Sequence, residues 1–380
     1  DVGRIISFNS GKAKITARSS TTVVACTITT AFTNTNATEA FNLGAFSDTT
    51  GHPSCVSFFE QRLVFAGTTD EPQTLFFSKA GDYENMTTGT NADDAMVYTI
   101  ASNQVNAIRY MKAVRTLVVG TTGGEFTVSA DGTDASITPT NITIKRQSSF
   151  GSANVDAIPA GNAILFLQKA KRKIRELQYN FDSDGYQAPD LTILNETVTD
   201  TGINEMSYQQ EPGSNIWCVR DDGVLACLTY QRSENVIAWS RHIFGGVFGS
   251  GKAVCESVAS ISGVLTEDEV WVIVKRTING ATKRFVECFS DFDFDETSPT
   301  SFKFLDSHLS YSGSGTTTLS GLAHLEGQTV SVLGDGATHA NKTVSSGAIT
   351  LDRSVTSACV GLPYDSILQT MRIEGGAAEG

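Results

Sequence analysis

The chain has 380 residues, 40% of them hydrophobic and 18% charged, so it is long enough to bury a large core and has an ordinary globular balance. Its 41 acidic and 28 basic residues give a net charge of −13, which argues against general affinity for nucleic acid, because binding to phosphates needs Lys and Arg. No apolar run approaches the roughly 18 residues of a membrane-spanning helix, and no signal peptide is visible. The sequence begins with Asp1 rather than Met, so we expect it to be a piece of a longer polypeptide.

A short pattern with apolar first and fourth positions returns about every fifty residues. Successive copies start 50, 50, 48 and 52 residues apart. The five copies are Cys55–Phe58, Val105–Ile108, Val155–Ile158, Ile203–Met206 and Cys255–Val258. A period in this range, filled with strand-like segments, indicates a β-propeller or a similar β-repeat array.

Each repeat then continues with a second segment that is apolar throughout, which predicts a strand covered on both faces. These segments are Leu63–Phe65, Leu117–Val119, Ile164–Phe166, Ile216–Cys218 and Val270–Val272. A third, more alternating set follows at Leu75–Phe77, Phe126–Val128, Ile174–Leu177, Leu225–Leu228 and Phe285–Cys288. A fourth, more variable set is predicted at Met96–Ile100, Ile142–Lys145, Leu191–Leu194, Val236–Trp239 and Phe302–Leu305.

The turns between the second and third segments are typical of tight hairpins. Thr122–Gly124 and Asp221–Gly223 carry the Gly and Asp that such turns favour, and Ile278–Gly280 contains an Asn-Gly pair. Four antiparallel strands per repeat is the plan of a propeller blade. The sequence therefore favours a propeller over a β-sandwich with accidental spacing.

The chain divides into three predicted parts. Residues 1–50 contain strand-like runs at Val2–Phe8, Lys14–Thr16 and Thr22–Thr29, and form either the end of a preceding domain or an extra blade. Residues 51–305 are the propeller, with five visible repeats. Residues 306–380 become rich in Gly, Ser and Thr and predict a small, truncated β-barrel or sandwich. Its expected strands are Thr329–Leu333, Asn341–Val344, Ala348–Leu351 and Ala358–Leu362. The predicted class is thus all-β, a β-propeller of four-stranded blades with this small flanking domain.

The seven cysteines are odd in number and form no C-x-x-C pair. They are Cys26, Cys55, Cys218, Cys227, Cys255, Cys288 and Cys359. Several lie in apolar strands, which favours free thiols in a reducing compartment over a disulfide framework or a zinc site. A single bridge between neighbouring strands stays open as an alternative.

Three charged segments are candidate binding sites. Asn180–Gly185 begins like a calcium loop, but Leu191 stands where that loop needs Glu, so an acidic hairpin or inter-strand loop is favoured. Asp291–Glu296 holds four carboxylates, which we interpret as a solvated strand exit rather than a cation site. Lys169–Arg175 is basic and is expected at a hairpin tip, with contact to phosphate or an acidic partner as the alternative.

The sequence contains no recognisable catalytic motif. The five histidines, His52, His242, His308, His324 and His339, are scattered. Asp221–Asp222 would suit a glycosidase but is explained by its turn, and Ser129–Gly132 lacks the spacing and the copies of a sialidase box. Trp217 and Trp271 are expected to be buried core residues rather than sugar platforms. We therefore assign no catalytic, cofactor-binding or metal residue, no cofactor and no enzymatic activity.

Seven segments, in order along residues 45–375, resemble a known family. They are Gly51–Leu63, Pro72–Tyr83, Ile100–Ile108, Gly151–Val155, Arg172–Leu177, Tyr208–Pro212 and Val360–Tyr364. Together they are similar to the tail nozzle family of short-tailed bacteriophages, also called tail tubular protein B.

This resemblance implies a virion structural protein, assembled in the host cytoplasm, that forms a homohexameric ring at the distal end of the tail. The ring would contact a tail adaptor protein and tail fibre or receptor-binding proteins, and genomic DNA would pass through its acidic lumen without specific binding or stable membrane insertion. The resemblance carries over no catalytic residue. Two alternatives remain: a propeller that binds or cleaves host surface polysaccharide, and a scaffold for a host protein.

Overall fold

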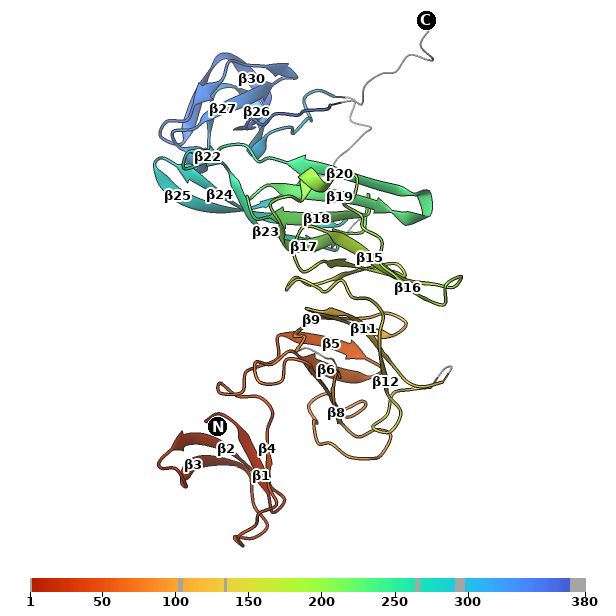
Figure 1. Ribbon diagram of the computed structural model, residues 1–380. Helices are drawn as coiled ribbons and strands as arrows, with labels where there is room; N and C mark the ends of the chain where they lie inside the picture. Colours follow the sequence, from red (N-terminus) through yellow and green to blue (C-terminus); the bar gives the residue numbers. More distant parts are fainter. Residues whose placement is uncertain (1, 102–104, 133–134, 264–266, 291–297, 370–380) are drawn as a thin grey trace, which may run out of the picture. The chain divides into compact units, whose positions relative to one another are not determined.

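The computed structural model describes residues 2–101, 105–132, 135–263, 267–290 and 298–369. The described chain is built from antiparallel β-sheets, as the sequence predicts, with only short 3-10 turns at Glu196–Val198, Arg232–Glu234 and Ala323–Leu325 (Figure 1). No helix among these residues is both long and apolar enough to cross a bilayer. The chain forms two compact units, Asp1–Glu196 and Thr197–Gly380, which are described separately.

The first unit begins with a small sheet of its own. Its strands are β1 (Ile5–Phe8), β2 (Gly11–Arg18), β3 (Val24–Thr30) and β4 (Asn42–Leu43), in the order β3-β2-β1-β4. The sequence predicts strands at the positions of β1, β2 and β3. The central strand β2 buries Ala13 and Ile15, whereas every residue of β3 is exposed.

Three further sheets follow in the first unit, each with four antiparallel strands in simple sequence order. The first contains β5 (Cys55–Phe59), β6 (Arg62–Ala66), β7 (Thr74–Phe77) and β8 (Met96–Thr99). The second contains β9 (Ile108–Ala113), β10 (Leu117–Thr121), β11 (Gly124–Ser129) and β12 (Thr143–Arg146). The third contains β13 (Ile158–Ala160), β14 (Ala163–Leu167), β15 (Ile174–Asn180) and β16 (Gly185–Gln187).

The second unit continues the series with two more sheets of the same kind. One contains β17 (Ile203–Gln209), β18 (Asn215–Arg220), β19 (Leu225–Gln231) and β20 (Val236–His242). The next contains β23 (Val254–Ile261), β24 (Glu269–Ile278) and β25 (Ala281–Cys288), preceded by the small ribbon of β21 (Val247–Phe248) and β22 (Gly251–Lys252). The two-residue turn between β24 and β25 has left-handed residues at Asn279 (φ 48°) and Gly280 (φ 72°), which confirms the Asn-Gly hairpin.

Two of the predicted fourth strands are wrong. Leu191–Leu194 forms a turn, because the chain reverses directly after β15 and Gly185–Gln187 pairs with that strand instead. Phe302–Leu305 is not a strand either, so the sheet β23–β25 has three strands within the described residues. In the second and third repeats the recurring pattern precedes its strand, and only its fourth residue, Ile108 or Ile158, enters the ladder.

Neighbouring sheets pack face to face, and this explains why some strands are buried throughout. In the sheet β9–β12, Leu117 and Val119 join the core shared with β5–β8, whereas Val118 and Tyr110 join the core shared with β13–β16. Successive residues of a strand point to opposite faces, so β10 needs apolar residues at every position. The prediction of two covered faces is confirmed for β10 and β14.

The same prediction is wrong for β6 and β24, where buried and partly exposed residues alternate. In β24, Val270, Val272 and Val274 enter the core shared with the sheet β17–β20, and Trp271 and Ile273 between them are only half-buried. An apolar residue between two core residues therefore does not show that the other face of the sheet is covered, because half-buried apolar residues are common on protein surfaces.

The C-terminal part of the second unit, from Asp306, is a separate sheet with its own core (Figure 1). Its strands are β26 (Asp306–Ser320), β27 (Thr329–Gly334), β28 (Ala337–Thr338), β29 (Lys342–Thr343) and β30 (Ala348–Leu362), in the order β26-β30-β27-β28, with β29 paired to β27. The two strands expected at Ala348–Leu351 and Ala358–Leu362 are one long strand, β30. Strand β26 was not predicted, because its Ser, Gly and Thr residues lack apolar alternation.

Candidate functional site

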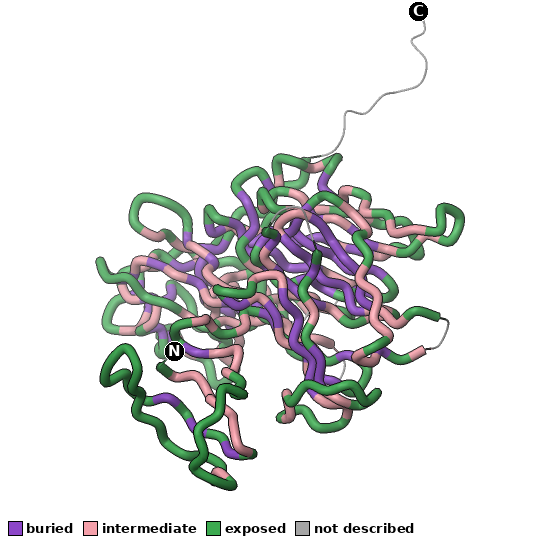
Figure 2. The backbone as a smooth tube through the Cα atoms, turned by 60° about the horizontal axis from the view of Figure 1, so that its bottom comes forward, coloured by how far each residue is buried: buried purple, intermediate pink, exposed green. Residues whose placement is uncertain are grey.

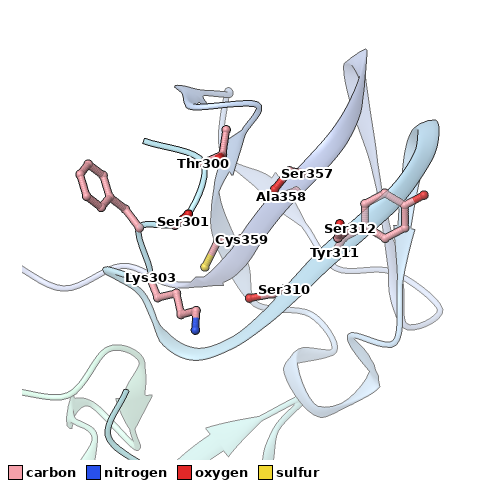
Figure 3. A pocket seen from close by; sticks show the side chains of 10 residues that line it. Thr300, Ser301, Lys303, Ser310, Tyr311, Ser312, Ser357, Ala358 and Cys359 are labelled. Carbon is pink, nitrogen blue, oxygen red and sulfur yellow. The ribbon is translucent and has the colours of Figure 1, made fainter. Parts of the chain in front are cut away.

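The C-terminal sheet carries a polar surface depression of about 300 Å³, at the small end of the range for ligand pockets (Figure 3). It is lined by Thr300, Ser301, Phe302, Lys303, Ser310, Tyr311, Ser312, Ser357, Ala358 and Cys359. Lys303 is the single charged group in this lining. Burial raises the pKa of the Cys359 thiol to about 11, so the thiol is protonated near neutral pH and is a poor nucleophile. The depression offers hydrogen bonds to a polar ligand but no acid–base pair.

The calcium-like segment Asn180–Gly185 lies at the tip of the β15–β16 hairpin. Its polar atoms serve the turn: Asn180 Oδ1 accepts a hydrogen bond from the backbone N–H of Ser183 at 3.0 Å, and Asp184 Oδ1 accepts one from the Tyr179 hydroxyl at 2.6 Å. Phe181, between the carboxylates, is 87% exposed. The segment thus has the form of the acidic hairpin favoured above. Asp291–Glu296 lies outside the described residues.

The basic segment Lys169–Arg175 forms the turn between β14 and β15, as expected, but part of its charge is used internally. Lys173 Nζ lies 2.9 Å from Asp190 and 3.4 Å from Glu196. Arg175 donates to Gln168 and to the Ala188 carbonyl, and its guanidinium lies 3.5 Å from the centre of the Phe150 ring. This segment therefore stabilises its own sheet.

The two tryptophans singled out in the sequence differ in their surroundings. Trp217 is buried as expected and donates from Nε1 to Gln209 at 3.0 Å. Trp271 was expected to be buried too, but it is half-buried, because it points away from the core that Val270 and Val272 enter, and it donates to Glu269 at 2.9 Å.

The histidine nearest to a catalytic arrangement is His242, whose Nε2 lies 3.1 Å from Ser240 Oγ. A Ser–His pair that acts as nucleophile and base also needs a group that orients the imidazole. Here the ring packs against Trp217 and Phe289, with centroid distances of 5.0 and 6.4 Å. Burial lowers the pKa of His242. The surroundings of His242 are those of a core aromatic residue.

Asp221 and Asp222, the candidate glycosidase pair, are both engaged in the turn after β18. Asp222 binds Arg220 at 2.8 and 3.1 Å, and Asp221 accepts a hydrogen bond from Asn204. Arg220 also donates to the Val198 carbonyl at 2.6 Å and to Asp200 at 3.1 Å. These carboxylates hold the start of β17 against the β18–β19 turn.

Buried charged residues are the feature that sequence reasoning missed. Glu125 on β11 is fully buried and accepts hydrogen bonds from Ser152 at 2.8 Å and from Ser148. Both serines lie in the connection from β12 to β13, so Glu125 fixes the link between two consecutive sheets. Burial raises the pKa of this carboxyl, and the two serine hydrogen bonds oppose that shift. A charged residue directly before the predicted strand Phe126–Val128 was the available signal.

Arg62 on β6 plays a similar part in the first repeat. It is 2% exposed and donates to the carbonyls of Ser78, Ala92 and Asp94 at 2.8, 2.7 and 2.7 Å. It therefore ties the long connection between β7 and β8 to the sheet. Burial lowers the pKa of its guanidinium, and the carbonyl oxygens satisfy the donors that water would otherwise bind.

Among the residues that the structure describes, no three or more His, Cys, Asp or Glu side chains gather closely enough to hold a metal ion. The seven cysteines are free thiols, and burial raises the pKa of Cys227 and of Cys255 to about 12.

No protein-family model and no curated protein sequence matches the chain.

Proposed function

We propose that this chain is a structural protein of a bacteriophage tail, in which the repeated sheets are blades of a β-propeller and several copies form the nozzle ring around the DNA exit channel. The observation that carries the proposal is how successive sheets meet: β5 packs against β9 in the first unit, and β17 packs against β23 in the second. Each of these is the first strand of its sheet.

Close approach of first strands is what a radial array of blades requires, because the innermost strands of a propeller surround a common axis. In the second unit β18 also contacts β23. A β-sandwich has two sheets with a single core between them. The cores on both faces of the sheet β9–β12 also support an array of more than two layers.

The assignment to a tail rests on the family resemblance. Its segments Gly51–Leu63 and Pro72–Tyr83 supply β5, the first two residues of β6 and all of β7, and Arg172–Leu177 supplies the start of β15. Gly151–Val155, by contrast, lies in the connection between β12 and β13, so the resemblance covers both strands and connections. The net charge of −13 supports the same proposal, since a negatively charged channel repels DNA and allows it to pass without adhesion.

The polar clusters support a structural role as well. The carboxylates of Asp222, Asp184 and Glu125 and the guanidinium of Arg62 all bind groups within their own unit. Such contacts stabilise turns and inter-sheet connections. A tail component that must withstand DNA passage needs rigid blades of this kind.

Immunogold labelling of purified phage particles with an antibody to this chain tests the proposal. We expect label at the tip of a short tail and sixfold rings in micrographs of the purified protein. Label on fibres, together with release of oligosaccharides from host polysaccharide, would replace the nozzle with the carbohydrate-active alternative. A monomer that is absent from particles would contradict both the ring and the tail assignment.

A further inference from the structure

Strand β3 has the sequence pattern of a half-buried strand, yet all seven of its residues are exposed. Val24, Cys26 and Ile28 alternate with smaller or polar residues, which predicts one buried face. Val24 is 46% exposed and Ile28 is 61% exposed. In Figure 2 the N-terminal part of the tube includes long green, exposed stretches.

The register shows that this exposed face continues a buried one. Ile28 lies opposite Ala13 of β2 and Cys26 lies opposite Ile15, so each pair shares a face of the sheet. Ala13 and Ile15 are 2% and 4% exposed. The apolar face is thus covered at β2 and uncovered at the adjacent β3, where a further layer or strand would complete it.

Strand β3 is also an edge strand whose residues offer no protection, although two register shifts interrupt its pairing with β2. It is outermost in the order β3-β2-β1-β4, and Val24–Thr30 contains neither a charged residue nor proline. Natural proteins usually guard exposed edges with Lys, proline or bulges, because free N–H and C=O groups accept a strand from another chain. The edge strands β12 and β25 follow that rule, with Lys145 and Lys283 respectively.

A second unguarded edge lies at the other end of the chain. Among the described residues, strand β26 is outermost in the C-terminal sheet, and Leu309–Ser320 contains neither charge nor proline. Between Leu309 and Ser312 it pairs with β30 without a register shift, so this stretch is regular, although bulges follow it. Leu309 is 41% exposed.

The parts that carry these edges have opposite net charge. Residues 2–44 contain Arg4, Lys12, Lys14 and Arg18 against Glu39. Residues 306–369 contain Asp306, Glu326, Asp335, Asp352 and Asp365 against Lys342 and Arg353. Lys12 and Lys14 are exposed on β2, directly beside β3. Pairing of β3 with a second β3 would bring these cations together, whereas pairing with the acidic C-terminal sheet would not.

We infer that β3 of one copy of this chain pairs with the free edge of β26 in a second copy, so that subunits associate head to tail. Such a contact uses two different surfaces, and its repetition closes a ring when the rotation between subunits allows it. The added strand would give the exposed side chains of β3 cross-strand neighbours and satisfy both rows of free backbone groups. The inference rests on the proposed ring and names the surfaces that form it.

Substitutions on the two edges test the contact. Ile28→Lys and Leu309→Lys place a guarding charge on exposed positions, so neither is expected to unfold the chain. Each should weaken self-association by about tenfold or more, as loss of a central interface side chain does. Native mass spectrometry over a concentration series measures this, and circular dichroism checks folding. Phe181→Lys, at an exposed hairpin tip, is the matched control and should leave assembly unchanged. Wild-type assembly by both edge variants would overturn the inference.

Crosslinking identifies the partner of β3. Cys26 is a native, exposed thiol on β3, and Ser310→Cys adds a thiol on β26 in a Cys288→Ser background. A short bismaleimide should then join many subunits into a ladder, whereas chains with Cys26 but without the thiol at position 310 should stay uncrosslinked. Dimers from Cys26 without the second thiol would show β3–β3 pairing and overturn the head-to-tail contact.

Labelling of phage particles distinguishes a failure of the β3–β26 contact from a failure of the nozzle proposal. Wild-type label at the tail tip, with Ile28→Lys chains still forming rings, would refute this contact and leave the nozzle proposal standing. Wild-type chains that neither self-associate nor occur in particles would refute both.

Discussion

The buried guanidinium of Arg276 forms a two-point ion pair with Glu287 on the neighbouring strand. The Nη1–Oε1 distance is 2.5 Å and the Nη2–Oε2 distance is 3.1 Å. Arg276 is fully buried and the Glu287 side chain is 16% exposed. Arg276 Nε also donates to the Gly245 carbonyl at 2.8 Å, and Gly245 N–H in turn donates to Asp306 at 2.6 Å. The pair therefore links the β24–β25 hairpin to the first residue of the C-terminal sheet.

Replacing Arg276 by alanine should destabilise the second unit by about 3 kcal/mol, because it leaves the Glu287 carboxylate largely buried and unpaired. All three tryptophans, Trp217, Trp239 and Trp271, lie in that unit, so fluorescence during urea unfolding follows it selectively. Arg284→Ala is the control: its ion pair with Glu256 is largely solvent-exposed, and the loss should be much smaller. Equal losses of unfolding free energy in the two variants would show that burial does not set the strength of these ion pairs.

Acid should weaken the second unit through Glu256. Hydrogen bonds from Arg284 and then Lys275 lower the pKa of this carboxyl from 4.5 to about 2. Because the folded pKa lies below the unfolded value, the stabilisation is complete above pH 4.5 and is lost as the pH falls toward 2. Glu256→Gln should therefore lower the urea midpoint at pH 6 and converge with the wild type near pH 2. A deficit that does not change with pH would contradict this origin.

The Asn279–Gly280 turn allows a test of backbone conformation without crowding. Gly280 has φ 72°, and no atom of the described residues lies within 4 Å of the position a Cβ would take, so Gly280→Ala should cost about 1 kcal/mol from the left-handed backbone. Gly223 has a similar φ of 79°, but its Cβ would lie 3.0 Å from Val254 Cα. Gly223→Ala should therefore cost clearly more in the same unfolding measurement. The reverse order would contradict the assigned turn geometry.

Arg62 should control the mobility of the connection between β7 and β8. Arg62→Met keeps the apolar stem and removes the charge-assisted hydrogen bonds to four backbone carbonyls. Amides in residues 79–95 should then exchange with deuterium about tenfold faster or more, since each such bond is worth about 1.5–3 kcal/mol. Arg18→Met, on the exposed end of β2, should leave that exchange unchanged. Unaltered protection in the Arg62 variant would show that packing alone holds the connection.

Much of the repeated β structure was predictable from sequence because the signal is local. Apolar runs such as Leu117–Val119 identify the inner strands, and the Asn-Gly pair at 279–280 identifies its hairpin. The fourth strands were less predictable, since they lie at sheet edges where packing imposes little pattern. Gly185–Gln187, for example, pairs with β15, whereas the more apolar Leu191–Leu194 forms a turn.

The candidate sites show the same division. The sequence identified the turns at Asn180–Gly185 and Asp221–Gly223, because the conformation of a turn depends on a few neighbouring residues. It did not identify the partners of Glu125 or Arg276, which are brought together from different segments of the chain.

By itself, the sequence determined the all-β class, the period of about fifty residues, the hairpin turns and the acidic net charge. Only the tertiary structure decided which strands are covered on both faces, which charges are buried in pairs, and that the apolar alternation of β3 faces solvent. The reason is physical: strand and turn preferences depend on residues a few positions apart, whereas burial depends on which distant sheet packs against a face.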